Sequence, residues 1–185
     1  MFKKLVIATA IIAASSSVAI ASPCCANTGA PYVGVSLSNN TVGAGNSYYR
    51  GITGNISLGY GAIVSPCVYL AGEIFGIPGS GSETNNTGQG SVSARTTWGY
   101  GASIIPGWYL NDKSMIYGRL GGTVSHFNGP NSNKGGWHVG VGGQTTIMPC
   151  WDLRGEYTYT EYSRISALGR PQSDMFSLGL VYKIA

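Results

Sequence analysis

Apolar and polar residues alternate along eight separate segments of this chain. Successive side chains of a β-strand point to opposite faces, so alternation with a period of two indicates a strand with one apolar and one polar face. Between Trp151 and Tyr159, one face carries aromatic residues, leucine and glycine, whereas the other carries Asp152, Arg154 and Glu156. The eight segments cover approximately residues 32–38, 49–61, 67–76, 92–106, 114–127, 136–148, 151–162 and 174–184.

Long and short connections alternate between these segments. The long connections are polar and rich in Gly, Asn and Ser, and they cover residues 39–48, 77–91, 128–135 and 163–173. The short connections cover residues 62–66, 107–113 and 149–150. Short turns at one end, long loops at the other and an even number of antiparallel strands are typical of transmembrane barrels. We therefore predict an all-β fold, an eight-stranded antiparallel up-and-down transmembrane β-barrel.

The composition agrees with an outer surface that is not in water. Only 10% of the residues are charged, whereas the chain has 29 glycines, 12 tyrosines and 4 tryptophans. Such a balance is unusual for a soluble globular domain. Beyond the first residues, no apolar run is long enough for a membrane-spanning helix, so a closed barrel is the structure that could cross a bilayer. The nearly balanced charge also leaves no basic footprint for nucleic acid, and we expect no nucleic-acid partner.

The first residues have the layout of a secretory signal peptide. Lys3 and Lys4 precede a short apolar run over residues 5–14, and Ala19-Ile20-Ala21 offers a cleavage site. We expect cleavage after Ala21, which makes residues 1–21 the signal peptide. Residues 22–185 then form one outer-membrane barrel domain, exported to the bacterial outer membrane.

The charges of the predicted strands, except those close to the strand ends, lie on the face opposite the bulky apolar residues. An arginine that faces lipid at the middle of a bilayer costs about 2–4 kcal/mol, so this face points into the lumen. Buried charges persist when they are paired and hydrogen-bonded. We predict a charge network in the lumen that consists of Glu73, Arg95, Arg119, Gln144, Asp152, Arg154, Glu156 and Lys183.

The four cysteines are Cys24, Cys25, Cys67 and Cys150, and this topology brings all of them to the periplasmic rim. An even number of cysteines in an exported chain favours disulfides, and four cysteines allow three connectivities. The turns of Cys67 and Cys150 lie on opposite sides of the ring. We therefore favour pairing of these two with Cys24 and Cys25, and free or mispaired thiols are the alternative. No His or Cys spacing resembles a zinc site, and we expect no cofactor.

Large aromatic residues fall on the outward faces or near strand ends, as expected for girdles at the two membrane interfaces. A carbohydrate-binding stack is the alternative. These residues are Tyr60, Trp98, Tyr100, Trp108, Trp137, Trp151, Tyr159 and Tyr182. Ser125, His126 and His138 raise the possibility of an enzyme, but we find no nucleophile with a positioned base and an orienting third group. We expect both histidines at the rim.

Two stretches carry a family resemblance. The first runs from Gly99 through Asp112 to Gly121, and the second is the C-terminal set Ser177, Gly179, Tyr182 and Ile184. The first is similar to the central hairpin of the small outer-membrane β-barrels of Gram-negative bacteria, the group of opacity-type surface antigens and of outer membrane protein A. The second resembles the assembly signal of that family. The resemblance implies three partners: outer-membrane lipid, lipopolysaccharide and the outer-membrane assembly machinery.

These observations favour a non-enzymatic barrel with a structural or surface-antigen, adhesin-like role through its long extracellular loops. A narrow ion-conducting, porin-like channel is the first alternative because the lumen is charged. A lipid A-modifying outer-membrane enzyme is the second. A soluble lipocalin-like barrel would need charged outward faces, which the sequence lacks. The loop residues identify no host receptor or extracellular ligand.

Overall fold

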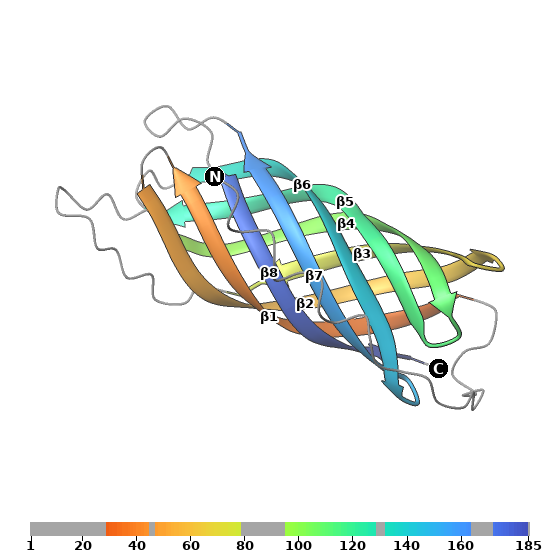
Figure 1. The fold of residues 1–185 in the computed structure, drawn as a ribbon. Helices are drawn as coiled ribbons and strands as arrows, with labels where there is room; N and C mark the ends of the chain where they lie inside the picture. Colours follow the sequence, from red (N-terminus) through yellow and green to blue (C-terminus); the bar gives the residue numbers. More distant parts are fainter. Residues whose placement is uncertain (1–28, 45–46, 79–94, 129–131, 164–171, 185) are drawn as a thin grey trace, which may run out of the picture.

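The computed structural model describes residues 29–44, 47–78, 95–128, 132–163 and 172–184. These residues form a closed barrel of eight antiparallel strands (Figure 1), which confirms the predicted fold. The strands are β1 Ala30–Ala44, β2 Ser47–Ser65, β3 Val68–Ile77, β4 Arg95–Asn111, β5 Ser114–Asn128, β6 Ser132–Met148, β7 Trp151–Tyr162 and β8 Gln172–Lys183. Each strand pairs with its neighbours in sequence, and β8 pairs with β1 to close the ring. Among the described residues, no helix is long and apolar enough to cross a membrane.

Several strands extend further than the alternation predicted. β1 was expected over residues 32–38 but continues to Ala44, and β2 begins at Ser47, so the connection expected over 39–48 is mostly strand. β6 likewise begins at Ser132, inside the connection expected over 128–135. These extensions are polar, and strand ends outside the bilayer need no apolar outward face. Backbone pairing therefore continues where the alternation of side chains has stopped.

The short connections are also tighter than expected. β4 runs past Pro106 to Asn111, although the segment was predicted to end at 106. Pro106 pairs with Leu70 of β3 but has no register partner on β5, which suits a residue without an N–H group. The turn that follows is closed by Asn111, whose Oδ1 accepts hydrogen bonds from the backbone N–H groups of Lys113 (2.9 Å) and Ser114 (2.8 Å).

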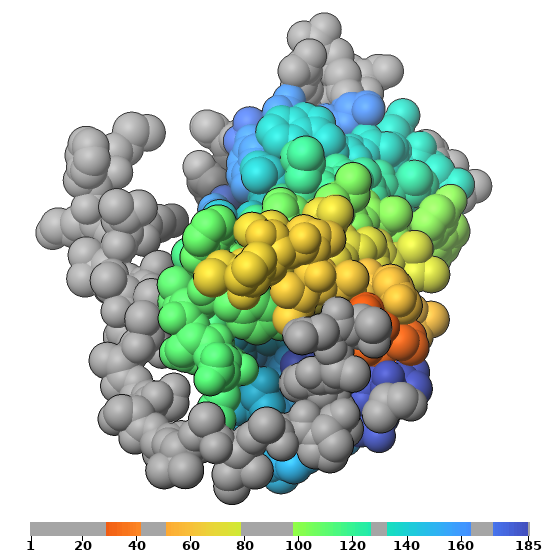
Figure 2. Space-filling model, turned by 90° about the vertical axis from the view of Figure 1, so that its right-hand side faces the viewer, coloured from red at the N-terminus to blue at the C-terminus, as the bar shows by residue number. Residues whose placement is uncertain are grey.

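The inner face has three layers from the turn end to the loop end. At the turn end lies the apolar layer, formed by Tyr32, Tyr69, Ala71, Ile105, Met115, Tyr117 and Val181. Charged residues occupy the middle of the lumen, and Asp152 and Lys183 lie lower, beside the apolar layer. Buried serines and threonines, such as Ser38, Ser125 and Thr160, line the loop end. Figure 2 views the turn end, where the hairpin of β2 and β3 (yellow) and that of β4 and β5 (green) project toward the viewer.

Candidate functional site

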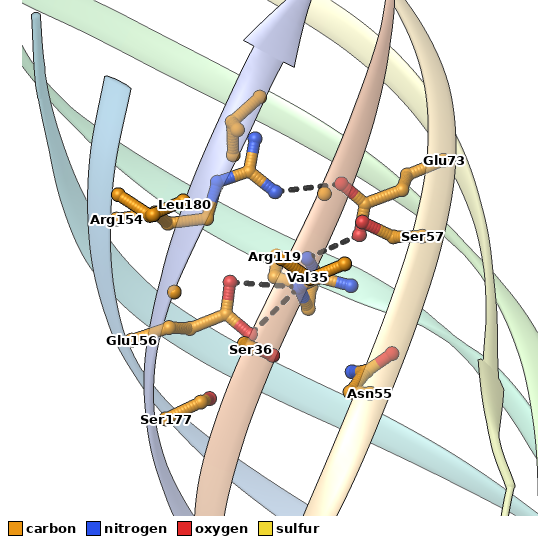
Figure 3. Close-up of a pocket in the computed structure, with 13 residues that line it drawn as sticks. Val35, Ser36, Asn55, Ser57, Glu73, Arg119, Arg154, Glu156, Ser177 and Leu180 are labelled. Atoms are coloured by element: carbon orange, nitrogen blue, oxygen red, sulfur yellow. Dashed lines mark hydrogen bonds and ion pairs between the residues drawn. The ribbon is translucent and has the colours of Figure 1, made fainter. Parts of the chain in front are cut away.

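The centre of the lumen holds a compact group of opposite charges from β3, β5 and β7. Arg119 Nη2 lies 2.6 Å from Glu73 Oε1, and Arg119 Nε lies 2.9 Å from the carboxylate of Glu156. Arg154 Nη1 lies 2.6 Å from the second carboxylate oxygen of Glu73. Figure 3 shows these side chains converging from opposite walls of the barrel. Glu73 therefore bridges two arginines, and Arg119 bridges two glutamates.

The contacts continue from this centre toward the turn end. Arg154 Nε donates to Gln144 Oε1 at 2.9 Å, and Gln144 Nε2 donates to Asp152 Oδ2 at 2.5 Å. Lys183 Nζ lies 2.8 Å from the same Asp152 oxygen. We call this chain of contacts the lumen network; it consists of Glu73, Arg119, Gln144, Asp152, Arg154, Glu156 and Lys183. Three carboxylates face three basic groups within it, so its formal charge is zero.

The eighth residue predicted for this network is Arg95, the first residue of β4. Its side chain lies outside the described part of the structure. Arg95 pairs with Asn128 at the loop end of the barrel. Its backbone position therefore separates it from the other members, which lie in the middle and at the turn end of the lumen.

Two tyrosines donate hydrogen bonds to the carboxylates of the lumen network. This role was not predicted from the sequence. The hydroxyl of Tyr32 donates to Glu73 at 2.9 Å, and that of Tyr117 donates to Glu156 at 2.8 Å. The guanidinium of Arg154 lies between the same two rings, 5.3 Å and 5.4 Å from their centroids. Such cation–π contacts add to the compensation of a desolvated charge. Tyr117 shares the inward face of β5 with Arg119, whereas β1, which carries Tyr32, has no charged residue. The alternation could not show which carboxylate each hydroxyl reaches.

The network nearly fills its level of the lumen. A cavity of about 30 Å³ remains between it and the walls formed by β1, β2 and β8, which is room for about one or two water molecules. Arg154 Nη2 and Asn55 Oδ1 are buried at its border without a hydrogen-bond partner among the described residues. These two atoms are the polar groups that a water molecule there would satisfy.

One expectation about the histidines is wrong. His138 is 2% exposed and lies inside the lumen rather than at the rim, where its Nε2 is 2.8 Å from Ser103 Oγ. The same serine oxygen accepts a hydrogen bond from Arg119 Nη1 at 3.1 Å. The signal was present in the sequence, because His138 shares the inward face of its strand with Gln144.

The serine and histidines considered for catalysis are not brought together. Ser125 Oγ faces Tyr162 in the lumen at 3.3 Å, whereas His126 stacks on Trp98 and contacts Asn133. His138 contacts Ser103 instead of either residue. Among the described residues, no group of His, Cys, Asp and Glu fits a metal ion.

The cysteine pairing also needs a correction. Cys150 is disulfide-bonded, whereas Cys67 is an exposed free thiol, and Cys24 and Cys25 lie outside the described residues. Bonded cysteines need Cα atoms within about 7 Å of each other, and residues adjacent in sequence are about 3.8 Å apart. Cys24 and Cys25 therefore cannot both reach turns on opposite sides of the ring. The bridge to Cys67 is not formed, and the partner of Cys150 stays a prediction.

The outer surface carries an apolar band between two sets of aromatic residues. Trp151 and Tyr182 pack together at the turn end, with ring centroids 5.0 Å apart. Trp98 and Tyr100 stack at the loop end, with centroids 5.8 Å apart. Along β4, the strand from Trp98 to Trp108 rises by about 25 Å at ~3.3 Å per residue and a tilt of about 40°. This height matches the apolar band of outer-membrane barrels.

A closed eight-stranded barrel with lipid-facing apolar residues, two aromatic girdles and compensated charges inside is a transmembrane barrel of the outer-membrane type. The chain belongs to the family of the outer membrane protein beta-barrel domain, whose model matches residues 6–183. The protein therefore resides in the bacterial outer membrane, in contact with its lipids.

Two solved structures share this fold with the chain. Neisserial surface protein A is 18% identical, and the match covers 83% of this chain and 97% of that one, with a TM-score of 0.57. Ail, the attachment invasion locus protein of Yersinia pestis, is 17% identical, with coverages of 85% and 99% and a TM-score of 0.54. No curated protein matches the sequence.

Proposed function

We propose that this protein is a non-enzymatic surface barrel that acts through its long extracellular connections, in a surface-antigen or adhesin-like role. The observation that carries the proposal is the filled lumen. The lumen network is neutral and joins five strands across the barrel, and the apolar layer fills the turn end beside Gln144 and Asp152. A barrel filled in this way presents only its outer surface and its loops to other molecules.

The two similar structures support this choice. One is a surface protein, and the other is named for attachment and invasion. Ail was also solved in complex with the heparin analogue sucrose octasulfate. A sulfated glycan is therefore the first extracellular probe for this protein.

The contact between Ser103 and His138 does not favour an enzyme. Ser103 also accepts from Arg119, and the pair is buried in the lumen. A hydrolase needs a third group that orients the histidine and a space for the substrate beside the serine. The lumen cavity of about 30 Å³ is too small for any part of a lipid A molecule.

We propose that β8 is the strand that the assembly machinery recognises. Its outward residues Phe176, Leu178, Leu180 and Tyr182 are exposed to lipid. Ser177 and Gly179 alternate with them on the inner face.

The adhesive role is tested with bacteria that display the protein. Cells with the intact barrel are expected to adhere to a heparin-coated surface. Cells with a variant in which Gly-Ser linkers replace residues 79–94 and 164–171 are expected not to adhere. Heat-modifiable mobility in gels and resistance to protease establish that both barrels are folded. Equal adhesion by the two strains would contradict a role of these connections.

The channel alternative is tested in planar bilayers. The refolded protein is expected to give no discrete conductance steps before or after reduction, because side chains fill the lumen and their contacts do not depend on the disulfide of Cys150. Regular conductance steps in either state would establish a pore and would contradict the proposal that the lumen is closed.

A further inference from the structure

The outer wall of the barrel has a hollow where three strands carry almost no side chain. Gly76 of β3, Ala102 of β4 and Gly122 of β5 form its floor. Ala102 is the register partner of both Ile74 and Gly122, and Gly76 lies one outward position further along β3. Neighbouring strands are about 4.8 Å apart, so this floor is about 10 Å wide.

Large apolar side chains surround the floor and turn it into a groove. The lining includes Ile56, Leu58 and Ile74 from β2 and β3, and Trp98, Tyr100 and Val124 from β4 and β5. The groove has a volume of about 900 Å³, and no charged residue lines it. The groove is shallow and open along the outer wall, so it suits an elongated apolar molecule that lies against the barrel.

The position of the groove identifies the kind of molecule that it meets. Its walls belong to the outward apolar surface, which is already the interface with lipid. Trp98 and Tyr100 belong to the aromatic girdle at the loop end, so the groove lies in the half of the band that faces the outer leaflet. An occupant must therefore come from within that leaflet.

The shape of the groove distinguishes between two possible occupants from the membrane, a second copy of the barrel and a lipid acyl chain. A second copy of the barrel would present a convex wall, which covers a hollow without filling it. An acyl chain is a flexible cylinder that conforms to a groove with a glycine floor. We propose that this groove binds an acyl chain of an outer-leaflet lipid, so that the barrel carries a specific lipid at this position.

The chain offers a matched pair of variants on one strand. Gly76 and Gly72 both lie on the outward face of β3, and an added Cβ would meet no atom within 4 Å at either position. Only Gly76 lines the groove. Gly76→Leu therefore fills the groove, and Gly72→Leu adds the same side chain to the same strand outside it. Gly122→Leu is a second filling variant, because its Cβ would approach no atom closer than 3.8 Å.

The test is native mass spectrometry of barrels purified in detergent and incubated with lipid A. The wild type and Gly72→Leu are expected to retain one lipid A molecule at equal concentrations of lipid. Gly76→Leu and Gly122→Leu are expected to retain it about tenfold less, because a leucine displaces at least two buried methylene groups of the chain. Mobility in gels establishes that every variant is folded.

Two results would overturn the proposal. Equal retention of lipid A by all four proteins would show that the groove does not bind it. A dimer in the spectra of the wild type that disappears in Gly76→Leu would assign the groove to a second copy of the barrel. Neither result depends on the adhesion assay, so failure of the lipid site is distinguishable from failure of the proposed function.

Discussion

At the scale of single residues, Arg119 is a buried charge held between two carboxylates. It is 7% exposed, and Glu73, Glu156 and Ser103 all contact its guanidinium. Breaking a buried ion pair by removing one partner is costly, because the other charge stays buried without compensation. Removal of the Arg119 charge therefore leaves a buried carboxylate without its cation.

Arg119→Met is expected to lower the free energy of unfolding by about 3–5 kcal/mol. Glu73 keeps Arg154 in this variant, but Glu156 loses the cation that it contacts in the structure. Urea unfolding of the protein in lipid vesicles, followed by tryptophan fluorescence, measures the effect.

Two further variants test whether this loss of stability comes from the uncompensated charge. Leu120→Met changes the adjacent, lipid-facing residue and is expected to change the stability by less than about 1.5 kcal/mol. Arg119→Met combined with Glu156→Gln is expected to recover part of the loss, because no uncompensated carboxylate remains. Equal stabilities of Arg119→Met and Leu120→Met would contradict a structural role of the network.

The sequence predicted the orientation of these residues but not their contacts. A period of two assigns Arg119, Arg154 and Glu156 to the inner face, and the structure places them there. The same period assigns Ser103 and His138 to that face, yet it cannot show that they meet across β5. Contacts across a lumen depend on the stagger between strands and on side-chain reach, which are properties of the closed ring.

At the scale of elements, each tyrosine of the apolar layer lies over an inward glycine of a neighbouring strand. An added Cβ at Gly142 would lie 2.5 Å from the ring of Tyr117, and one at Gly59 would lie 2.2 Å from the ring of Tyr32. The rings thus use the space that the glycines leave. This packing holds the Tyr117 hydroxyl against Glu156.

Gly142→Val is expected to destabilise the barrel by about 1–3 kcal/mol, because overpacking displaces Tyr117 from its carboxylate. Gly143→Val is the matched control. Its Cβ would point outward, with the nearest atom at 3.8 Å, so little change is expected. The same unfolding measurement compares the two variants, and an equal loss in both would indicate a general effect on β6 rather than a clash in the lumen.

Element boundaries were predicted well for β7 and poorly for β1. β7 occupies the predicted residues 151–162, where apolar and charged residues alternate throughout. β1 is longer than predicted because Asn39, Asn40 and Thr41 give no apolar face beyond the bilayer. The alternation thus indicates which residues of a strand lie within the lipid bilayer. The length of a strand also depends on backbone pairing that continues in water.

At the scale of the whole molecule, the apolar band sets how the barrel sits in the membrane. Ile104 lies on the outward face of β4, midway between Tyr100 and Trp108, and it is 59% exposed. Leu110 lies beyond Trp108, toward the turn. The same charge is therefore expected to cost different amounts at these two positions.

Ile104→Arg is expected to cost about 2–4 kcal/mol, and Leu110→Arg about 0–1 kcal/mol. Unfolding in vesicles of defined thickness measures both values. Equal costs at the two positions would contradict the placement of the band between the two girdles.

Because the barrel is closed, the same strand pairing is possible when the chain begins at a different strand. The backbone N–H of Ile184 donates to the carbonyl of Pro31 at 2.9 Å, so the two ends of the strand sequence meet at the turn end. A short linker could join them, and a cut between β3 and β4 or between β7 and β8 would give a circular permutant. Every strand would keep its neighbours, and every contact of the lumen network would be preserved. The permutants would differ only in which hairpin is synthesised and delivered to the membrane first. Comparing their assembly would therefore show whether the order of the strands along the chain matters for assembly when the folded structure is the same.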